Sequence, residues 1–135
     1  LGDGEIQEGQ VWEACMFSAH YKLDNLCVIV DNNGLQIDGP VDKVMSPYPI
    51  DEKLKAFGFH VEVIAGHDFG RIEAALNTAK TVKGQPTAIV MKTLKGKGVS
   101  FMEGQASWHG KAPNDEEYAI AMNELKAALA ELEGN

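Results

Sequence analysis

Two hydrophobic patterns alternate along this chain, and the alternation restricts the fold more than any other feature. Continuous runs rich in β-branched residues, typical of buried strands, occur at 26–31 (LCVIVD), 59–64 (FHVEVI) and 86–93 (PTAIVMKT). Helical patterns occupy 10–22, 50–57 and 69–82, and the apolar residues of 10–22 lie nearly all round the helix, as in a buried helix. Alternating strands and helices predict an α/β fold with a parallel sheet and helices on both faces.

A last helix is predicted near the C-terminus. Asn114 is a suitable N-cap, and Glu117 three residues later completes a capping box. The helix is expected to end at Gly134 and to carry one apolar stripe, formed by Tyr118, Met122, Leu125, Leu129 and Leu132. The 135 residues suit one domain.

Composition excludes several functional classes. The chain has 20 acidic and 12 basic residues, and its formal charge of −8 disfavours nucleic acid and anionic membranes as partners. Its sequence has no apolar run near the roughly 20 residues of a membrane span, so a soluble, cytoplasmic protein is expected. Cys15 and Cys27 lack metal or redox spacing and are expected to be buried, inert thiols.

Three loops are expected to meet at one edge of the sheet. They are GDG at 2–4, DNNGLQIDG at 31–39 and LKGKGVSFMEGQASWHGK at 94–111. The second and third directly follow predicted strands, and the first does so if a strand precedes Leu1. Ligands of open parallel sheets bind beyond the carboxyl ends of the strands, so these loops are the candidate site.

The first two loops carry oxygen ligands. Between Gly4 and Asn32 lie 27 residues, about what a βαβ unit needs to bring two strand ends together, so Asp3 and Asn33 could face one point. Carboxylate and amide oxygens suit Mg²⁺, and the nearby glycines allow close approach of phosphates. The alternative is two ordinary turns in which Asp and Asn serve local hydrogen bonding.

GDG followed at this spacing by NN resembles the thiamine diphosphate motif. Three segments in order, GDGEIQEGQVWEA, NNGLQIDG and KGKGVSFMEGQASWHGKAP, narrow the resemblance to the transketolase family and cover essentially the whole chain. The resemblance implies the thiamine diphosphate-binding fold, a partial doubly wound sheet, with residues 1–135 as the C-terminal part of the diphosphate- and Mg²⁺-binding domain. Because the family's domain begins before GDG, we expect a chain truncated at its N-terminal side.

The resemblance also implies roles for individual residues. Asp3, Asn33 and the backbone carbonyl of Leu35 match the Mg²⁺ ligands, for which Ca²⁺ or Mn²⁺ can substitute. The matches to cofactor contacts are Gly4 and Lys95 at the diphosphate, Ile37 at the rings, and His109 at the diphosphate and the reacting oxygen. Glu8 and Glu13 resemble acidic residues that link two active sites across a transketolase dimer; a first-turn acid is the alternative for Glu8.

Other candidates are expected to be structural. Lys97 and Lys111 match the family less clearly and could be solvated loop lysines. The remaining histidines have no metal-like spacing and the tryptophans suit packing; these residues are His20, His60, His67, Trp12 and Trp108.

The implied function is that of a transketolase N-terminal subunit. Such an enzyme is a transferase that moves a two-carbon ketol unit from a ketose phosphate to an aldose phosphate with thiamine diphosphate and Mg²⁺. A pyrimidine-binding C-terminal subunit would complete the site, in a heterotetramer with a homodimeric core, and the chain alone is expected to be inactive. The alternatives are deoxyxylulose phosphate synthase, dihydroxyacetone synthase, or a truncated, non-catalytic domain that binds a partner.

Overall fold

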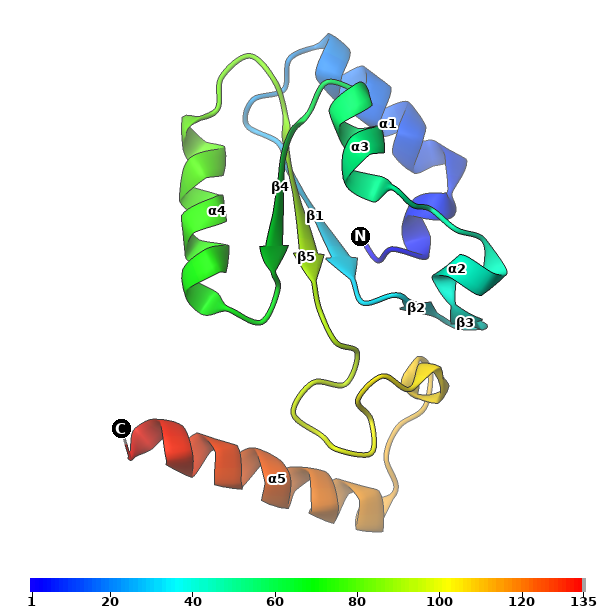
Figure 1. Cartoon of the computed structure of the whole chain (residues 1–135), viewed down its shortest axis with the longest axis vertical. Helices are drawn as coiled ribbons and strands as arrows, with labels where there is room; N and C mark the ends of the chain where they lie inside the picture. The colour runs from blue at the N-terminus through cyan, green and yellow to red at the C-terminus, as the bar shows by residue number, and fades with distance from the viewer. Residues whose placement is uncertain (135) are drawn as a thin grey trace.

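A parallel sheet of three strands forms the centre of the computed structural model, which describes residues 1–134 (Figure 1). The strands are β1 (Cys27–Asn32), β4 (His60–Ala65) and β5 (Thr87–Lys92), in the order β1-β5-β4. Along β5, each residue from first to last pairs with one residue of β1 and one of β4. The three carboxyl ends are therefore level at one edge, as the sequence predicts.

Helices cover both faces of the sheet, which confirms the predicted fold class. Figure 1 shows α1 (Gly9–His20) and α3 (Ile50–Ala56) on one side and α4 (Phe69–Thr81) on the other. The remaining elements are short except the last: η1 (Glu5–Gln7), β2 (Leu35–Gln36), β3 (Gly39–Pro40), α2 (Val41–Val44), η2 (Ala106–Trp108) and α5 (Asp115–Glu133). No helix among residues 1–134 is long and apolar enough to cross a membrane.

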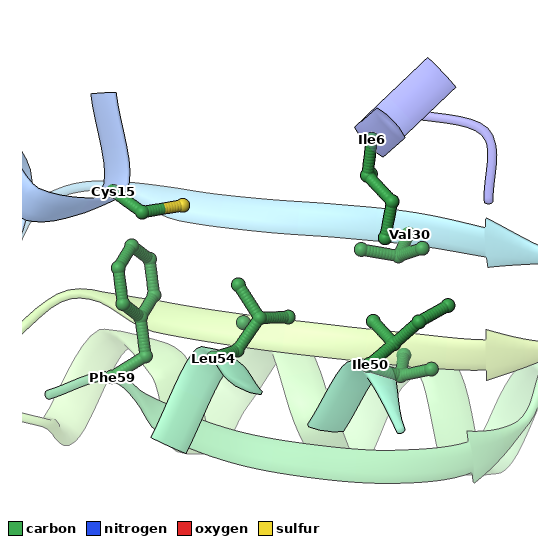
Figure 2. Close-up of a cluster of buried hydrophobic side chains, with 8 residues drawn as sticks. Ile6, Cys15, Val30, Ile50, Leu54 and Phe59 are labelled. Atoms are coloured by element: carbon green, nitrogen blue, oxygen red, sulfur yellow. The ribbon is translucent and has the colours of Figure 1, made fainter. Parts of the chain in front are cut away.

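The hydrophobic core lies between the sheet and the α1/α3 layer. Figure 2 shows Ile6 pointing toward Val30, and Cys15 lying opposite Phe59. The cluster is completed by Ile50, Leu54, Ala88 and Val90. Because these residues come from η1, α1 and α3 as well as from β1 and β5, the core joins the start of the chain to the sheet.

The expectation that residues 10–22 form a buried helix is wrong for this chain. Only Cys15 and Ser18 of α1 are buried, whereas Met16 and Phe17 are 54% and 58% exposed. The described residues cover one face of α1 and leave the other open. In the same way, Ile29 in β1 is 38% exposed, so that strand is not covered on both faces.

The thiols are protected to different degrees. Cys15 is buried as expected, but Cys27 is only half-buried, which corrects the expectation for that residue. Burial raises the pKa of both thiols above the usual value, and the carboxylate of Glu62 adds to the rise in the pKa of Cys27.

Helix α5 begins at the predicted capping box. Asn114 Oδ1 accepts from the Glu117 N–H at 2.9 Å, and Glu117 Oε2 accepts from the Asn114 N–H at 2.8 Å. Gly134 is the C-cap, also as predicted. The helix runs beyond the strand ends, away from the sheet (Figure 1), and Ala121 is its only buried residue among those described. Four residues of its apolar stripe, Tyr118, Leu125, Leu129 and Leu132, are exposed, whereas Met122 is half-buried.

Leu54→Ala tests the core assignment. Leu54 is 3% exposed within the cluster, so the truncation should lower the free energy of unfolding by about 2–5 kcal/mol. The measurement is denaturant unfolding, with Leu132→Ala as the control because Leu132 is 76% exposed and should change stability little. Equal effects of the two substitutions would contradict the assignment.

Candidate functional site

The first three residues extend the sheet edge beside β1. The Leu1 amine donates to Ile29 O at 2.9 Å, and the Asp31 N–H donates to Leu1 O at 2.8 Å. The Asp3 N–H donates to Asp31 O at 3.1 Å, and Gly2 forms a parallel bridge with Asp31. This pairing places GDG next to the end of β1, so the first two predicted loops lie side by side.

The carboxylate of Asp3 is buried, and its two oxygens differ in their hydrogen bonds. The residue is 1% exposed. Oδ2 accepts two hydrogen bonds, from the Gly34 N–H at 2.6 Å and from Asn32 Nδ2 at 2.8 Å. Oδ1 is buried and has no hydrogen-bond partner among residues 1–134. A buried carboxylate oxygen without a partner is costly, and a bound cation would satisfy it.

The loop after β1 turns sharply toward the β2/β3 hairpin. Asn33 Oδ1 accepts from the Leu35 N–H at 2.9 Å, and Gly34 between them has φ +78°, which favours glycine. Ile37 is 68% exposed at the hairpin's turn. A Cβ on Gly4 would lie 2.7 Å from the Cβ of Gln36, so glycine is needed where GDG approaches the hairpin.

The loop after β5 brings Lys95 and His109 to the same edge. The Gly104 N–H donates to Lys95 O at 2.9 Å, and Gly96 has φ +72° with no room for a Cβ beside the Met102 carbonyl. At the loop's beginning, the Leu94 N–H donates to His67 Nε2 at 2.7 Å. The loop is thus folded back on itself and attached to the turn after β4.

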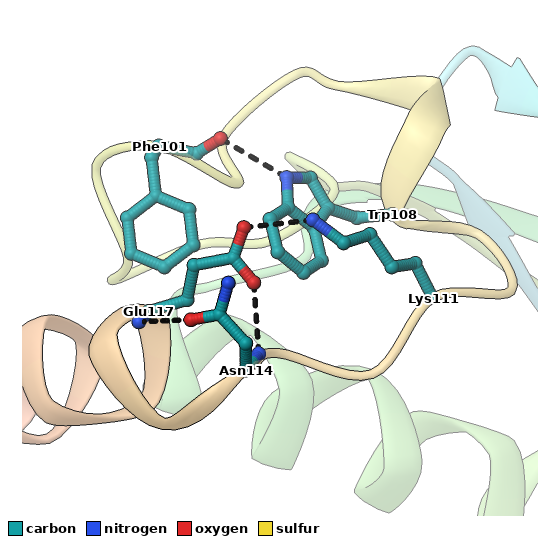
Figure 3. Close-up of polar contacts among 5 residues, drawn as sticks. All are labelled: Phe101, Trp108, Lys111, Asn114 and Glu117. Carbon is teal, nitrogen blue, oxygen red and sulfur yellow. Dashed lines mark hydrogen bonds and ion pairs between the residues drawn. The ribbon is translucent and has the colours of Figure 1, made fainter.

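The far end of this loop is anchored to α5 (Figure 3). Trp108 Nε1 donates to Phe101 O at 3.2 Å, and the two rings pack with centroids 5.3 Å apart. Lys111 Nζ lies 4.2 Å from the centroid of Trp108 and 2.7 Å from Glu117 Oε1, the capping-box carboxylate. These contacts confirm Trp108 as a packing residue; Trp12 likewise stacks on Phe57.

One cavity of about 430 Å³ lies where the three loops meet. All seven residues expected to contact cofactor or metal line it: Asp3, Gly4, Asn33, Leu35, Ile37, Lys95 and His109. Gly2, Glu5, Asp31 and Gln36 complete the lining. The described residues contain no cluster of three or more His, Cys, Asp or Glu suited to a metal, so a cation here would also need amide and backbone oxygens.

The other candidates lie elsewhere. Glu8 lines a separate, more apolar cavity of about 460 Å³ between α1 and β1, and Glu13 is exposed on α1. Lys97 Nζ lies 3.4 Å from Glu103 Oε1, and Lys111 is paired with Glu117; neither lysine lines the three-loop cavity.

Sequence reasoning missed the polar residues behind Asp3. Asn32, Tyr48 and Lys92 form a connected group that includes the Asp3 carboxylate. Asn32 could have been found, because it precedes Asn33 in the NN pair. Tyr48 lies in an irregular segment between α2 and α3, where no pattern indicates a contact with β1.

Comparison with known proteins identifies the family. The chain matches the family profile "Transketolase, thiamine diphosphate binding domain" over residues 1–129. The chain belongs to the transketolase family. It is 42% identical over 133 residues to a 6-deoxy-6-sulfo-D-fructose transketolase subunit of Clostridium sp. (strain MSTE9), covering 98% of this chain and 46% of that protein.

Other transketolases extend this comparison. An apulose-4-phosphate transketolase subunit of Actinobacillus succinogenes is 41% identical over 127 residues, covering 93% of this chain and 45% of that protein. The crystal structure of Campylobacter jejuni transketolase superposes with a TM-score of 0.85 at 36% identity, covering 91% of this chain and 19% of that one. The chain thus has the thiamine diphosphate-binding fold and spans slightly less than half the length of the two bacterial subunits.

The anchoring of the third loop should weaken in acid. Three carboxyls that hold it have a pKa below the usual 4.5: Glu103 through the Gly98 N–H, Glu117 through Lys111, and Glu124 through the Ser100 hydroxyl. Because each pKa is lower in the folded state, the stabilisation is present above pH 4.5 and is lost as the pH falls through the folded values.

Hydrogen exchange measures this effect. The protection factors of the Gly98 and Ser100 amides, which donate to Glu103 and Glu124, should fall as the pH drops below about 4.5. In Glu124→Gln the pH dependence should disappear at Ser100 and remain at Gly98. A pH dependence at Ser100 that survives this substitution would contradict the assignment.

Proposed function

We propose that this chain supplies the diphosphate and metal half of a transketolase site, which transfers a two-carbon ketol unit from a ketose phosphate to an aldose phosphate. The main support is the convergence of seven expected residues on one cavity at the strand ends. In this proposal residues 1–135 are the C-terminal part of the diphosphate-binding domain.

Mg²⁺ is the proposed metal, with Ca²⁺ or Mn²⁺ as substitutes. The buried Oδ1 of Asp3, which lacks a partner among the described residues, fits a cation ligand. The Asn33 amide oxygen and the Leu35 carbonyl would add two neutral oxygens, and the cofactor's diphosphate the others. This donor set suits a hard cation that keeps an octahedral shell of oxygens.

Two further residues would act on the cofactor and substrate. Lys95, half-buried in the cavity lining, would place a positive charge on the diphosphate. His109, exposed in the same lining, would hydrogen-bond the substrate oxygen on which charge develops or exchange a proton with it. Thiamine diphosphate, when bound, supplies the electron sink for cleavage of the carbon–carbon bond.

Partner chains would complete this site. Two relatives are named as transketolase subunits, which supports a separate pyrimidine-binding subunit for this chain as well. The exposed apolar residues Met16 and Phe17 on α1 are suited to an interface between two copies, in a heterotetramer with a homodimeric core. Glu8 and Glu13, from the same end of the chain, would lie at that interface and link the two active sites.

Cofactor binding tests the proposed site. Asp3→Ala, in the intact protein that contains this chain, should weaken thiamine diphosphate and Mg²⁺ binding in calorimetry by more than the roughly 10- to 100-fold typical of outer-shell changes. Asp42→Ala is the control, because the Asp42 side chain is 56% exposed on α2. Unchanged cofactor affinity in Asp3→Ala would overturn the metal assignment.

Assays with different donor substrates then distinguish transketolase from other thiamine diphosphate enzymes. With the partner subunit present, xylulose 5-phosphate should serve as donor and pyruvate should not; use of pyruvate would instead indicate deoxyxylulose phosphate synthase. Apulose 4-phosphate and 6-deoxy-6-sulfo-D-fructose belong in the same assay, because they appear in the names of similar proteins.

A further inference from the structure

Three side chains lie behind Asp3 and outside the cavity lining. Asn32 ends β1 and Lys92 ends β5, where the two residues are register partners. Tyr48 reaches them from the segment between α2 and α3, with 36% of its surface exposed. None of the three lines the cavity that holds the expected cofactor residues, so a role for them must act through another residue.

The hydrogen bonds of Asn32 fix the orientation of its amide. Asn32 is 5% exposed, and Nδ2 donates one proton to Asp3 Oδ2 and the other to Tyr48 Oη, both at 2.8 Å. Oδ1 accepts from Lys92 Nζ. A lysine ammonium has only donors, so it can face only the amide oxygen. Lys92 therefore obliges the amide nitrogen to point toward Asp3 and Tyr48.

This orientation determines which oxygen of Asp3 stays available. Oδ2 is occupied by the Asn32 amide and the Gly34 N–H, and Oδ1 is left without a partner among residues 1–134. The Gly34 N–H belongs to a loop, whereas Asn32 belongs to a paired strand with its side chain held on three sides. Asn32 is thus the more rigid of the two donors that hold the carboxylate.

We infer that Asn32, oriented by Lys92 and Tyr48, is a positioning residue that holds the Asp3 carboxylate with Oδ1 directed at a divalent cation. The inference rests on the proposed function, because it assigns the cation to the diphosphate site.

Binding of Mn²⁺ in the presence of thiamine diphosphate tests this role, in the intact protein with its partner subunit. Asn32→Ala should weaken Mn²⁺ binding about 10- to 100-fold, the usual effect of removing an outer-shell partner, and should change the electron paramagnetic resonance spectrum of bound Mn²⁺. Tyr48→Phe should produce a smaller loss, because it removes only the acceptor of the second amide proton. Asn123→Ala, at an exposed position on α5, is the matched control and should bind as wild type.

The outcomes separate the two proposals. If wild type binds no Mn²⁺ with thiamine diphosphate, the proposed function fails and this inference fails with it. If wild type binds Mn²⁺, Asp3→Ala does not, and both Asn32→Ala and Tyr48→Phe bind with wild-type affinity and spectrum, only the inference is overturned. A lower unfolding temperature with unchanged Mn²⁺ affinity also overturns it, since that pattern indicates a purely structural role. Should Asn32→Ala fail to fold, wild-type affinity in Tyr48→Phe is sufficient to reject the inference.

Discussion

Parallel backbone pairing between Leu1–Asp3 and the end of β1 is the constraint on which the site depends. Three hydrogen bonds hold this short segment against the sheet edge, and they fix the position of GDG along the strand direction relative to NNG. The β1–β5 register then brings the third loop to the same level. Every functional loop directly follows a paired strand end. The hydrogen bonds between the strands therefore position the three loops around the cavity.

Charge presents a second constraint. The chain carries a formal charge of −8, and the cavity lining itself includes Asp3, Glu5 and Asp31 against one lysine. An anionic diphosphate would be repelled by such a lining. A divalent cation reverses the sign at the point of contact, so in the proposed site metal and diphosphate depend on each other for binding.

Much of this structure follows from the sequence, because strand and helix periodicities differ and parallel strands end at a common edge. The capping box at Asn114 and the convergence of Asp3 with Asn33 depend on short-range chemistry and on chain length, both of which can be read in the sequence. The short β2/β3 hairpin escapes such reasoning because two-residue strands have no periodicity. The contact of Tyr48 with Asn32 is tertiary and leaves no local signal.

The exposed face of α1 differs from expectation for another reason. Apolar residues all round a helix indicate that the helix is covered, but they do not say by which chain. Met16 and Phe17 are exposed among the described residues, so the apolar pattern predicts a covering layer that these residues do not provide.

Glu117 performs two tasks, and this joins two parts of the molecule. One carboxylate oxygen caps the first turn of α5, and the other binds Lys111, whose ammonium lies over the Trp108 ring beside His109. Unwinding the first turn of α5 would release Lys111, and displacement of the loop would remove a partner from the helix cap. The helix start and the His109 loop are therefore expected to open and close as one cooperative unit.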